Sequence, residues 1–281
     1  MKKYLAVLRV KEIVGKAGFF MVGTLFARPE ITVDNTFRAS HFFLVCLLNG
    51  VAIYLINAGL GYRHDAANER LKGTQQLNRP GILTVGFSLA VIALIWIYLF
   101  SEQLILPSII VYMLWTIYSL PKGFKGIPLM GMTCAFVAQL FHFHIGYMAF
   151  SHYTVYSIAV SVYFGLLFAG GHALHEVIDH DADQQARLRT SAVTFGRHAV
   201  FQLSTVLFAI AAVHLVFIAW YGIIEWKIIA PYLVASCVHF VMLFVNGSED
   251  NDKLFVYRRK YMILYFVATI VVAIVMYVGR V

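Results

Sequence analysis

Three carboxylates lie within five residues, at Asp179, Asp181 and Asp183, beside a hydrophobic segment long enough to cross a bilayer. Charged side chains next to a membrane are costly and usually mark a functional site. Glu176, Asp179 and Asp183 are spaced three and four residues apart, so they would share one helix face, whereas Asp181 would point elsewhere. Like charges this close need a cation or a basic partner. The pattern predicts a divalent-metal site for a phosphorylated substrate, and the alternative is an acidic loop paired with its own arginines.

A second acidic pair, Asp65 and Glu69, follows an earlier apolar segment. Helical spacing of four residues would place Asn57 and Gly61 on the same stripe as this pair. Two carboxylates one turn apart suit Mg2+, which prefers oxygen ligands and completes its shell with waters and substrate phosphates. We predict that this pair contributes to the same metal site. A solvated loop held by Glu–Arg pairs is the alternative.

A short turn from Tyr118 to Pro128 carries Lys122 and Lys125. Lysine is a point charge suited to phosphate oxygens, although ordinary anchoring of a cytoplasmic loop would also explain either residue.

Histidines flank both acidic clusters. His64 adjoins Asp65 and could touch an acceptor or a phosphate, and a loop histidine is equally consistent with the sequence. His172 and His175 share a helix face that leads into Glu176. A soft-metal site there would need more converging ligands than the sequence offers.

The elements that must position these residues are hydrophobic helices. The chain has 281 residues, 13% charged residues and a mean hydropathy of +0.76. Soluble domains carry roughly twice that charged fraction. We predict one all-α polytopic membrane domain over residues 1–281, whose first segment is retained rather than removed as a signal peptide. About nine transmembrane helices are expected, at 9–27, 40–62, 81–101, 104–120, 127–149, 154–176, 199–222, 227–246 and 260–279.

The basic residues predict the orientation of this bundle. With the N-terminus inside and the C-terminus outside, all 22 Lys and Arg residues fall on the inner side except Arg28, Arg38, Lys227 and Arg280. Such asymmetry follows the positive-inside rule. It places both acidic clusters on the cytoplasmic face, and it explains the net charge of +8 without a nucleic-acid partner. The three cysteines lie in apolar segments and are expected to act as small hydrophobic residues.

These features, in this order, resemble the UbiA-type intramembrane prenyltransferases. The first motif of that family reads roughly N-D-x-x-D-x-x-x-D and is followed by Asn-Arg-Pro, and here Asp65-x-x-x-Glu69 precedes Asn78-Arg79-Pro80. The second family motif reads roughly D-x-x-x-D-x-x-x-G-x-[KR]-T. The chain has Asp179-x-x-x-Asp183-x-x-x-Arg187-x-Arg189-Thr190, with Arg187 in place of the usual glycine. The first motif departs further, because Gly61 stands where the family has its leading Asn.

The resemblance implies a UbiA-like helical bundle, Mg2+ as cofactor and a prenyl diphosphate as substrate. The chain would be an alkyl-transferring enzyme of a membrane, expected to be the bacterial inner membrane. By this likeness the metal would be held by Asp65, Glu69, Asp179 and Asp183, and the diphosphate by Tyr118, Lys125, Arg189, Arg70 and Arg79. Asp65 is also a candidate base for the acceptor proton, and catalysis would depend on Asp65, Asp179 and Asp183. Further candidates are Asn57, His64, Asn68 and Glu176.

The reaction itself stays open at this point. Quinone precursors and other aromatic or lipid-soluble molecules are all possible acceptors for such a fold. A UbiA-type terpene cyclase would capture the prenyl cation within the same molecule. A membrane transporter is the non-enzymatic alternative, although the acids lie at span ends rather than at mid-span.

Overall fold

A computed structural model describes residues 10–61, 78–246 and 251–278. Within these ranges every regular element is a helix, which confirms the all-α prediction. The predicted residues His64, Asp65, Asn68, Glu69 and Arg70 lie outside the described residues. The α-helices are α2 (Val10–Ala27), α3 (Val33–Leu60), α5 (Arg79–Phe100), α6 (Ile105–Ser119), α7 (Met130–Met148), α8 (Val155–Gln185), α9 (Ser191–Phe195), α10 (Arg197–Trp220), α11 (Trp226–Asn246) and α12 (Asn251–Val278), and two 3-10 turns are η2 (Glu102–Leu104) and η3 (Phe124–Gly126).

Each of the nine predicted spans overlaps one α-helix, and several helices extend beyond the predicted spans. The sixth span was expected to end at residue 176, whereas α8 continues to Gln185. The last span was expected to begin at residue 260, whereas α12 begins at Asn251. Hydropathy marks only the apolar part of a helix, and a helix can extend beyond it into polar sequence.

In the described part of the chain, six helices are long and apolar enough to cross a membrane. These helices are α3, α5, α8, α10, α11 and α12. The total of nine spans therefore stays a prediction.

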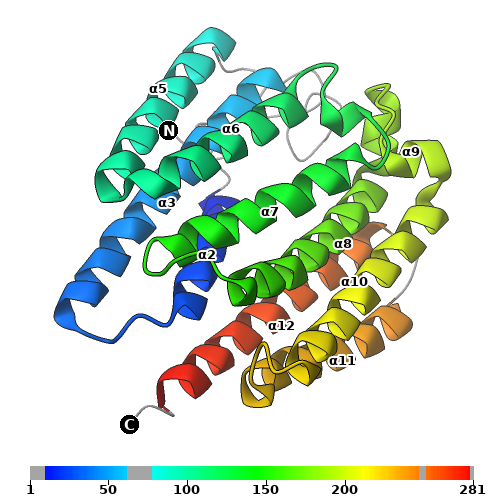
Figure 1. Ribbon diagram of the computed structural model, residues 1–281. Helices are drawn as coiled ribbons and strands as arrows, with labels where there is room; N and C mark the ends of the chain where they lie inside the picture. The colour runs from blue at the N-terminus through cyan, green and yellow to red at the C-terminus, as the bar shows by residue number, and fades with distance from the viewer. Residues whose placement is uncertain (1–9, 62–77, 247–250, 279–281) are drawn as a thin grey trace.

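The helices form two groups that meet at α7 and α8 (Figure 1). In the first group α2, α3, α6 and α7 pack in a closed ring, with α5 against the outside of α3. In the second group α8 packs on α10, and α11 packs on α12. Because α7 packs on both α6 and α8, the turn between α6 and α7 lies close to the end of α8.

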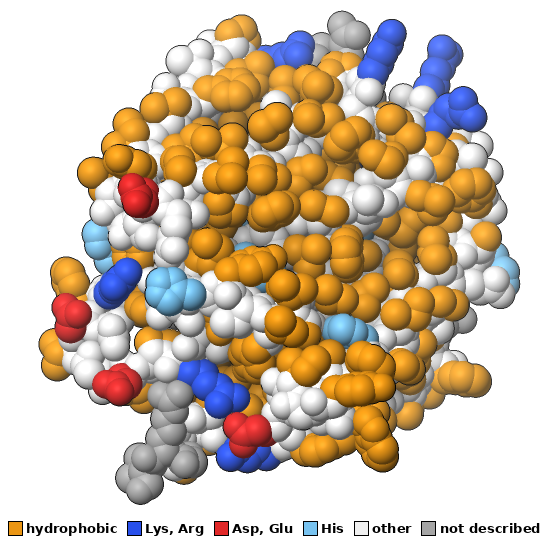
Figure 2. Space-filling model, in the orientation of Figure 1, with side chains coloured by type: hydrophobic (Ala, Val, Ile, Leu, Met, Phe, Trp, Pro, Cys, Tyr) orange, Lys and Arg blue, Asp and Glu red, His pale blue; other side chains and the backbone are white. Residues whose placement is uncertain are grey.

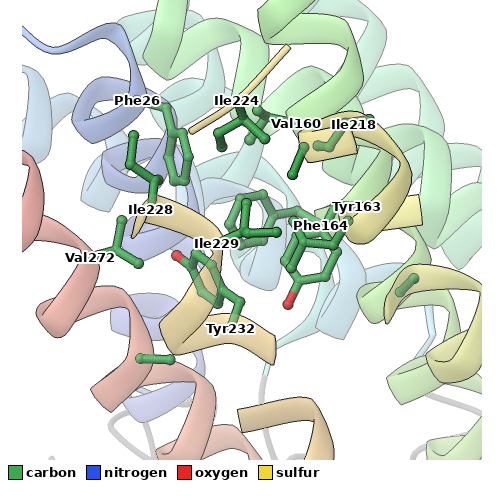
Figure 3. Close-up of a cluster of buried hydrophobic side chains, with 14 of the residues drawn as sticks. Phe26, Val160, Tyr163, Phe164, Ile218, Ile224, Ile228, Ile229, Tyr232 and Val272 are labelled. Carbon is green, nitrogen blue, oxygen red and sulfur yellow. The ribbon is translucent and has the colours of Figure 1, made fainter. Parts of the chain in front are cut away.

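Buried aromatic and branched side chains join the two groups. Figure 3 shows Phe26 of α2 facing Phe164 of α8 and Tyr232 of α11 across one hydrophobic cluster. The Phe26 and Phe164 ring centroids lie 5.8 Å apart in an edge-to-face arrangement. Aromatic pairs in this geometry add stability beyond the area that they bury. This packing holds α8 in a fixed position relative to α2 and α11.

The surface carries a broad band of exposed hydrophobic side chains (Figure 2). Along α5, for example, Val85, Ile92 and Leu99 recur every seven residues and are 51%, 50% and 74% exposed. Exposed apolar surface of this extent is expected of a helix that faces lipid. Lys and Arg side chains gather beyond the band, at the end of the molecule where α9 lies (Figure 2). The surface pattern agrees with a membrane-embedded bundle.

Candidate functional site

The acidic row of the second motif lies on the last three turns of α8. Glu176 and Asp183 are buried, with 7% and 5% exposure, and Asp179 is partly buried. Because all three belong to one continuous helix, their spacing of three and four residues places them along one face. Asp181 lies away from this row, as the spacing predicts. Its exposed carboxylate contacts His180 at 2.8 Å and Arg197 at 3.9 Å.

The end of α8 is closed by a backbone motif centred on Arg187. Leu188 N–H donates to the Asp183 carbonyl (2.9 Å), and Arg187 N–H donates to the Gln184 carbonyl (3.0 Å). This is the Schellman arrangement, which needs a left-handed residue at the position of Arg187. Arg187 has a φ of 57° there, which explains why related motifs place glycine at this point. Arg187 thus adopts a strained backbone conformation, which ends α8 within one turn of Asp183.

Lys125 reaches the acidic row from the η3 turn. Its Nζ lies 3.8 Å from Asp183 Oδ1, and the lysine side chain is 29% exposed while the aspartate is only 7% exposed. The neighbouring Lys122 is exposed on the same turn. The structure therefore brings Lys125 to the second acidic motif.

Glu176 is held by a segment that follows α8. The Ser191 backbone N–H donates to Glu176 Oε2 at 2.8 Å. The Ser191 hydroxyl in turn accepts a hydrogen bond from the Leu129 N–H at 2.9 Å. These bonds tie together α8, the start of α9 and the start of α7. They fix the carboxylate, because a buried charge needs hydrogen-bonding partners.

Two histidines of α8 pair with acids one turn later. His172 Nε2 lies 3.6 Å from Glu176 Oε1, and His175 Nε2 lies 3.4 Å from Asp179 Oδ2. The sequence signal for both pairs was the spacing of four residues on one helix. Sequence reasoning placed the histidines on the correct face but gave them no function, since it could not show where their rings point.

Gly131 makes the close packing around the first pair possible. A methyl group at position 131 would lie 2.9 Å from Glu176 Oε1 and 3.0 Å from His172 Nε2. Only a residue without a Cβ lets the start of α7 lie against this histidine and this glutamate. This position escaped sequence reasoning, because nothing in the local sequence shows what a glycine packs against.

Tyr118 and Asn57 approach from the first group of helices. The Tyr118 ring makes an edge-to-face contact with the His172 ring, with centroids 5.7 Å apart. Next to Tyr118, the Ser119 hydroxyl lies 2.8 Å from Asn57 Oδ1 and joins α6 to α3. Tyr118 therefore lies beside the part of α8 that carries the acidic row. Asn57 does not contact this row directly in these bonds but is hydrogen-bonded to Ser119, the residue after Tyr118.

The predicted arginines lie in different surroundings. Arg79 Nε donates to the Gly59 carbonyl at 2.8 Å, which satisfies a free carbonyl at the end of α3. Asn78 caps α5 by accepting from Gly81 N–H at 3.4 Å. The Asn-Arg-Pro element thus starts one helix and ties it to the previous one. Arg189 is exposed in the turn between α8 and α9.

The residues present fit part of a magnesium site. Asp179 and Asp183 offer carboxylate oxygens one helical turn apart, and Mg2+ is often held by one or two carboxylates together with substrate phosphates. Among the described residues there is no group of three or more Asp, Glu, His or Cys side chains able to hold a metal. The other predicted ligands, Asp65 and Glu69, lie outside the described residues.

A sequence profile of the UbiA prenyltransferase family matches residues 17–267. The chain belongs to this family. The match covers both groups of helices and the acidic row of α8. It confirms the resemblance that the two motifs indicated. No match was found among curated proteins.

Solved structures show the same fold at low sequence identity. A UbiA homolog from Archaeoglobus fulgidus superposes with a TM-score of 0.77 at 19% identity, covering 98% of this chain and 99% of that chain. A UbiA homolog from the same organism, bound to DMAPP and Mg2+, gives 0.75 at 17% identity and covers 95% and 99%. A digeranylgeranylglyceryl phosphate synthase gives 0.71 at 12% identity and covers 97% of each chain. Family members with this fold thus include proteins bound to a prenyl diphosphate and Mg2+.

Proposed function

We propose that this protein is an integral-membrane prenyltransferase. It moves an isoprenyl group from a prenyl diphosphate to an aromatic, quinone-precursor or other lipid-soluble acceptor, with Mg2+ as cofactor. The observation that carries this proposal is the contact between Lys125 of the η3 turn and Asp183 of α8. A lysine and a row of acids, brought together at one end of an apolar bundle, suit a metal–diphosphate headgroup. The neighbouring bundle suits an apolar chain.

The roles of the described residues follow from their chemistry and position. Asp179 and Asp183, together with Asp65 and Glu69, would hold Mg2+, which offsets the charge of the departing diphosphate when it is bound. Lys125 neutralises phosphate oxygens once these compete with Asp183 for its ammonium group. Tyr118 donates a hydrogen bond to the diphosphate, and the nearby arginines add positive charge. The arginines in question are Arg70, Arg79 and Arg189.

Metal and substrate binding also resolve an electrostatic problem in the acidic row. Buried acids repel one another unless cations lie between them or beside them. Lys125, at 3.8 Å from one carboxylate, compensates only part of this charge. A bound divalent cation would compensate the rest, so the row is favourable chiefly in the substrate complex.

The bundle is proposed to lie in a bacterial inner membrane with the N-terminus inside and the C-terminus outside. The basis is the distribution of Lys and Arg along the sequence. This orientation directs the acidic row and the η3 turn toward the cytoplasm, where a water-soluble diphosphate headgroup is accessible.

The proposal is tested with purified protein, geranyl diphosphate, MgCl2 and a panel of acceptors containing a hydroxybenzoate, a dihydroxynaphthoate and a glycerol phosphate. Diphosphate release and prenylated product are followed together. We expect product from at least one acceptor and loss of activity in EDTA. Asp179→Ala and Asp183→Ala should each lower the rate by roughly 100-fold or more.

Asp181→Ala is the matched control, because Asp181 lies off the acidic row and should retain near-normal turnover. Full turnover of both Asp179→Ala and Asp183→Ala would contradict the site assignment. A hydrocarbon product formed without acceptor would instead indicate a cyclase. Flux of substrate into liposomes without any chemistry would indicate a transporter.

A further inference from the structure

His172 and Glu176 form a carboxylate–imidazole pair, and neither residue is among the proposed ligands of Mg2+ or diphosphate. His172 Nε2 lies 3.6 Å from Glu176 Oε1, and the two side chains are only 12% and 8% exposed. A carboxylate this close to an imidazole stabilises the imidazolium form by its negative charge. Such a pair is suited to accept a proton from a bound molecule.

The carboxylate of this pair is fixed by the backbone around it. Glu176 Oε2 accepts the Ser191 N–H at 2.8 Å, so its other oxygen, Oε1, is directed toward His172. Gly131 packs against the same two atoms, since a Cβ there would lie 2.9 Å from Glu176 Oε1 and 3.0 Å from His172 Nε2. Glu176 of α8 is thus contacted by the start of α9 and the start of α7. A carboxylate fixed in this way can hold the His172 imidazole in one orientation.

The position of the pair relative to the diphosphate site is equally specific. The His172 ring contacts the Tyr118 ring, the proposed hydrogen-bond donor to the diphosphate. Glu176 precedes Asp179 by one turn on the same face of α8, which places His172 two turns before the metal carboxylates. His172 is therefore deeper along α8 than the proposed headgroup site, on the side where the reacting carbon of the prenyl chain would lie.

We propose that His172 is the base that takes the proton from the prenyl acceptor and that Glu176 is its positioning residue. This inference rests on the proposed function. The carbon–oxygen bond to diphosphate breaks, and diphosphate leaves with the electron pair. The acceptor nucleophile forms its bond to the prenyl carbon and loses its proton to His172. Glu176 stabilises the resulting imidazolium.

The inference narrows the class of acceptor. A base is needed where the nucleophilic atom carries a proton that it must lose, as in a phenol, an alcohol or an aromatic ring carbon. The buried setting of the pair favours an acceptor whose reacting part can enter a nearly dry region. Phenols and activated aromatic rings meet both conditions.

The decisive measurement is the partition of the prenyl group between acceptor and water. Geranyl diphosphate, MgCl2 and the acceptor found active with the wild type are incubated with His172→Gln, Glu176→Gln and the unaltered protein. Diphosphate, geranylated acceptor and geraniol are quantified. Loss of a general base costs roughly 100-fold or more. We expect the ratio of geranylated acceptor to geraniol to fall at least tenfold in His172→Gln and less in Glu176→Gln, while diphosphate release changes by less than about threefold.

His214→Gln is the control, since His214 lies on α10 and contacts the Ala159 carbonyl at 2.8 Å, away from the acidic row. Its partition ratio should equal that of the wild type. An unchanged ratio in His172→Gln overturns the inference and leaves the proposed function intact. Equal loss of diphosphate release and product in His172→Gln also overturns it, because the residue would then act in ionisation or folding. Absence of diphosphate release from the wild type overturns the proposed function itself.

Discussion

The two ends of the helical bundle use charged residues in different ways. At the end opposite α9, Glu225 pairs with Lys227 at 2.8 Å and with Arg28 at 3.4 Å. These side chains are between 32% and 62% exposed. At the α9 end, Asp183 is almost buried, and its pair with Lys125 is longer, at 3.8 Å. The exposed Glu225 has two closer ion-pair partners, and the buried Asp183 has one more distant lysine partner.

Under the proposed function, this difference distinguishes charges that connect loops from charges that bind a ligand. Exposed ion pairs contribute little to stability, because water already solvates both partners. Buried charges are expensive, so a chain keeps them only when a ligand or a mechanism requires them. The 3.8 Å separation of Lys125 and Asp183 is long enough for a ligand atom to approach the ammonium group. The same residue types therefore connect two loops at one end and form the candidate site at the other.

The largest expected difference in activity is between two lysine variants, one at each end of the bundle. Lys125→Met should lower kcat/KM for prenyl transfer about 100-fold, because an electrostatic contact to the departing diphosphate is lost. Lys227→Met should change it less than about twofold, because its exposed ion pair contributes little. Steady-state kinetics with geranyl diphosphate measures both. Equal losses in the two variants would remove the distinction between the ends.

A smaller effect is expected from adding one methyl group at the α9 end. Gly131→Ala places a Cβ about 3 Å from His172 and Glu176. We expect roughly 1–3 kcal/mol of destabilisation, as is typical of overpacked sites, and reduced prenyl transfer. Gly126→Ala is the matched control, because its Cβ would meet only Leu188 at an ordinary 3.6 Å. Thermal unfolding in detergent and turnover assays should show loss in the first variant and little change in the second.

Relief of backbone strain at Arg187, next to the acidic row, should increase the stability of the protein. Arg187 has a φ of 57° at the end of α8, a conformation that costs a non-glycine residue about 1 kcal/mol or more. Arg187→Gly should stabilise the protein by about 0.5–1 kcal/mol after the added flexibility of the unfolded chain is counted. Arg189→Gly, two residues later and without a positive φ, should give no such gain. Unfolding midpoints that move in the opposite order would refute the backbone explanation.

The smallest effect concerns pH at the end opposite α9. The hydrogen bond from Lys227 lowers the pKa of Glu225, and Arg28 acts in the same direction. A carboxylate with a lowered pKa stabilises the fold fully above the usual glutamate pKa of about 4.3, and this contribution disappears as the pH falls through the folded value. The unfolding midpoints of the wild type and Glu225→Gln should therefore differ slightly at pH 7 and converge below pH 4. Prenyl transfer at pH 7 should be unaffected.

Sequence reasoning worked best where one helix carried the whole pattern. The spacing of Asp179 and Asp183 separated them from Asp181, and the structure shows Asp181 exposed beside Arg197. Arg187, identified in the sequence as a departure from glycine, has the backbone conformation that explains glycine there. Hydropathy predicted the end of the membrane span at residue 176, whereas the helix that carries the acids continues to Gln185.

The sequence by itself determined the all-helical membrane class, the family and the face of α8 that carries the acids. These properties depend on hydropathy and on spacing within a single helix, which the order of residues specifies directly. Only the tertiary structure decided that Lys125 meets Asp183, that Ser191 holds Glu176 and that Gly131 admits His172 beside it. Each of these contacts joins segments that are distant in sequence. Their geometry depends on how α6, α7, α8 and α9 pack, which no local pattern specifies.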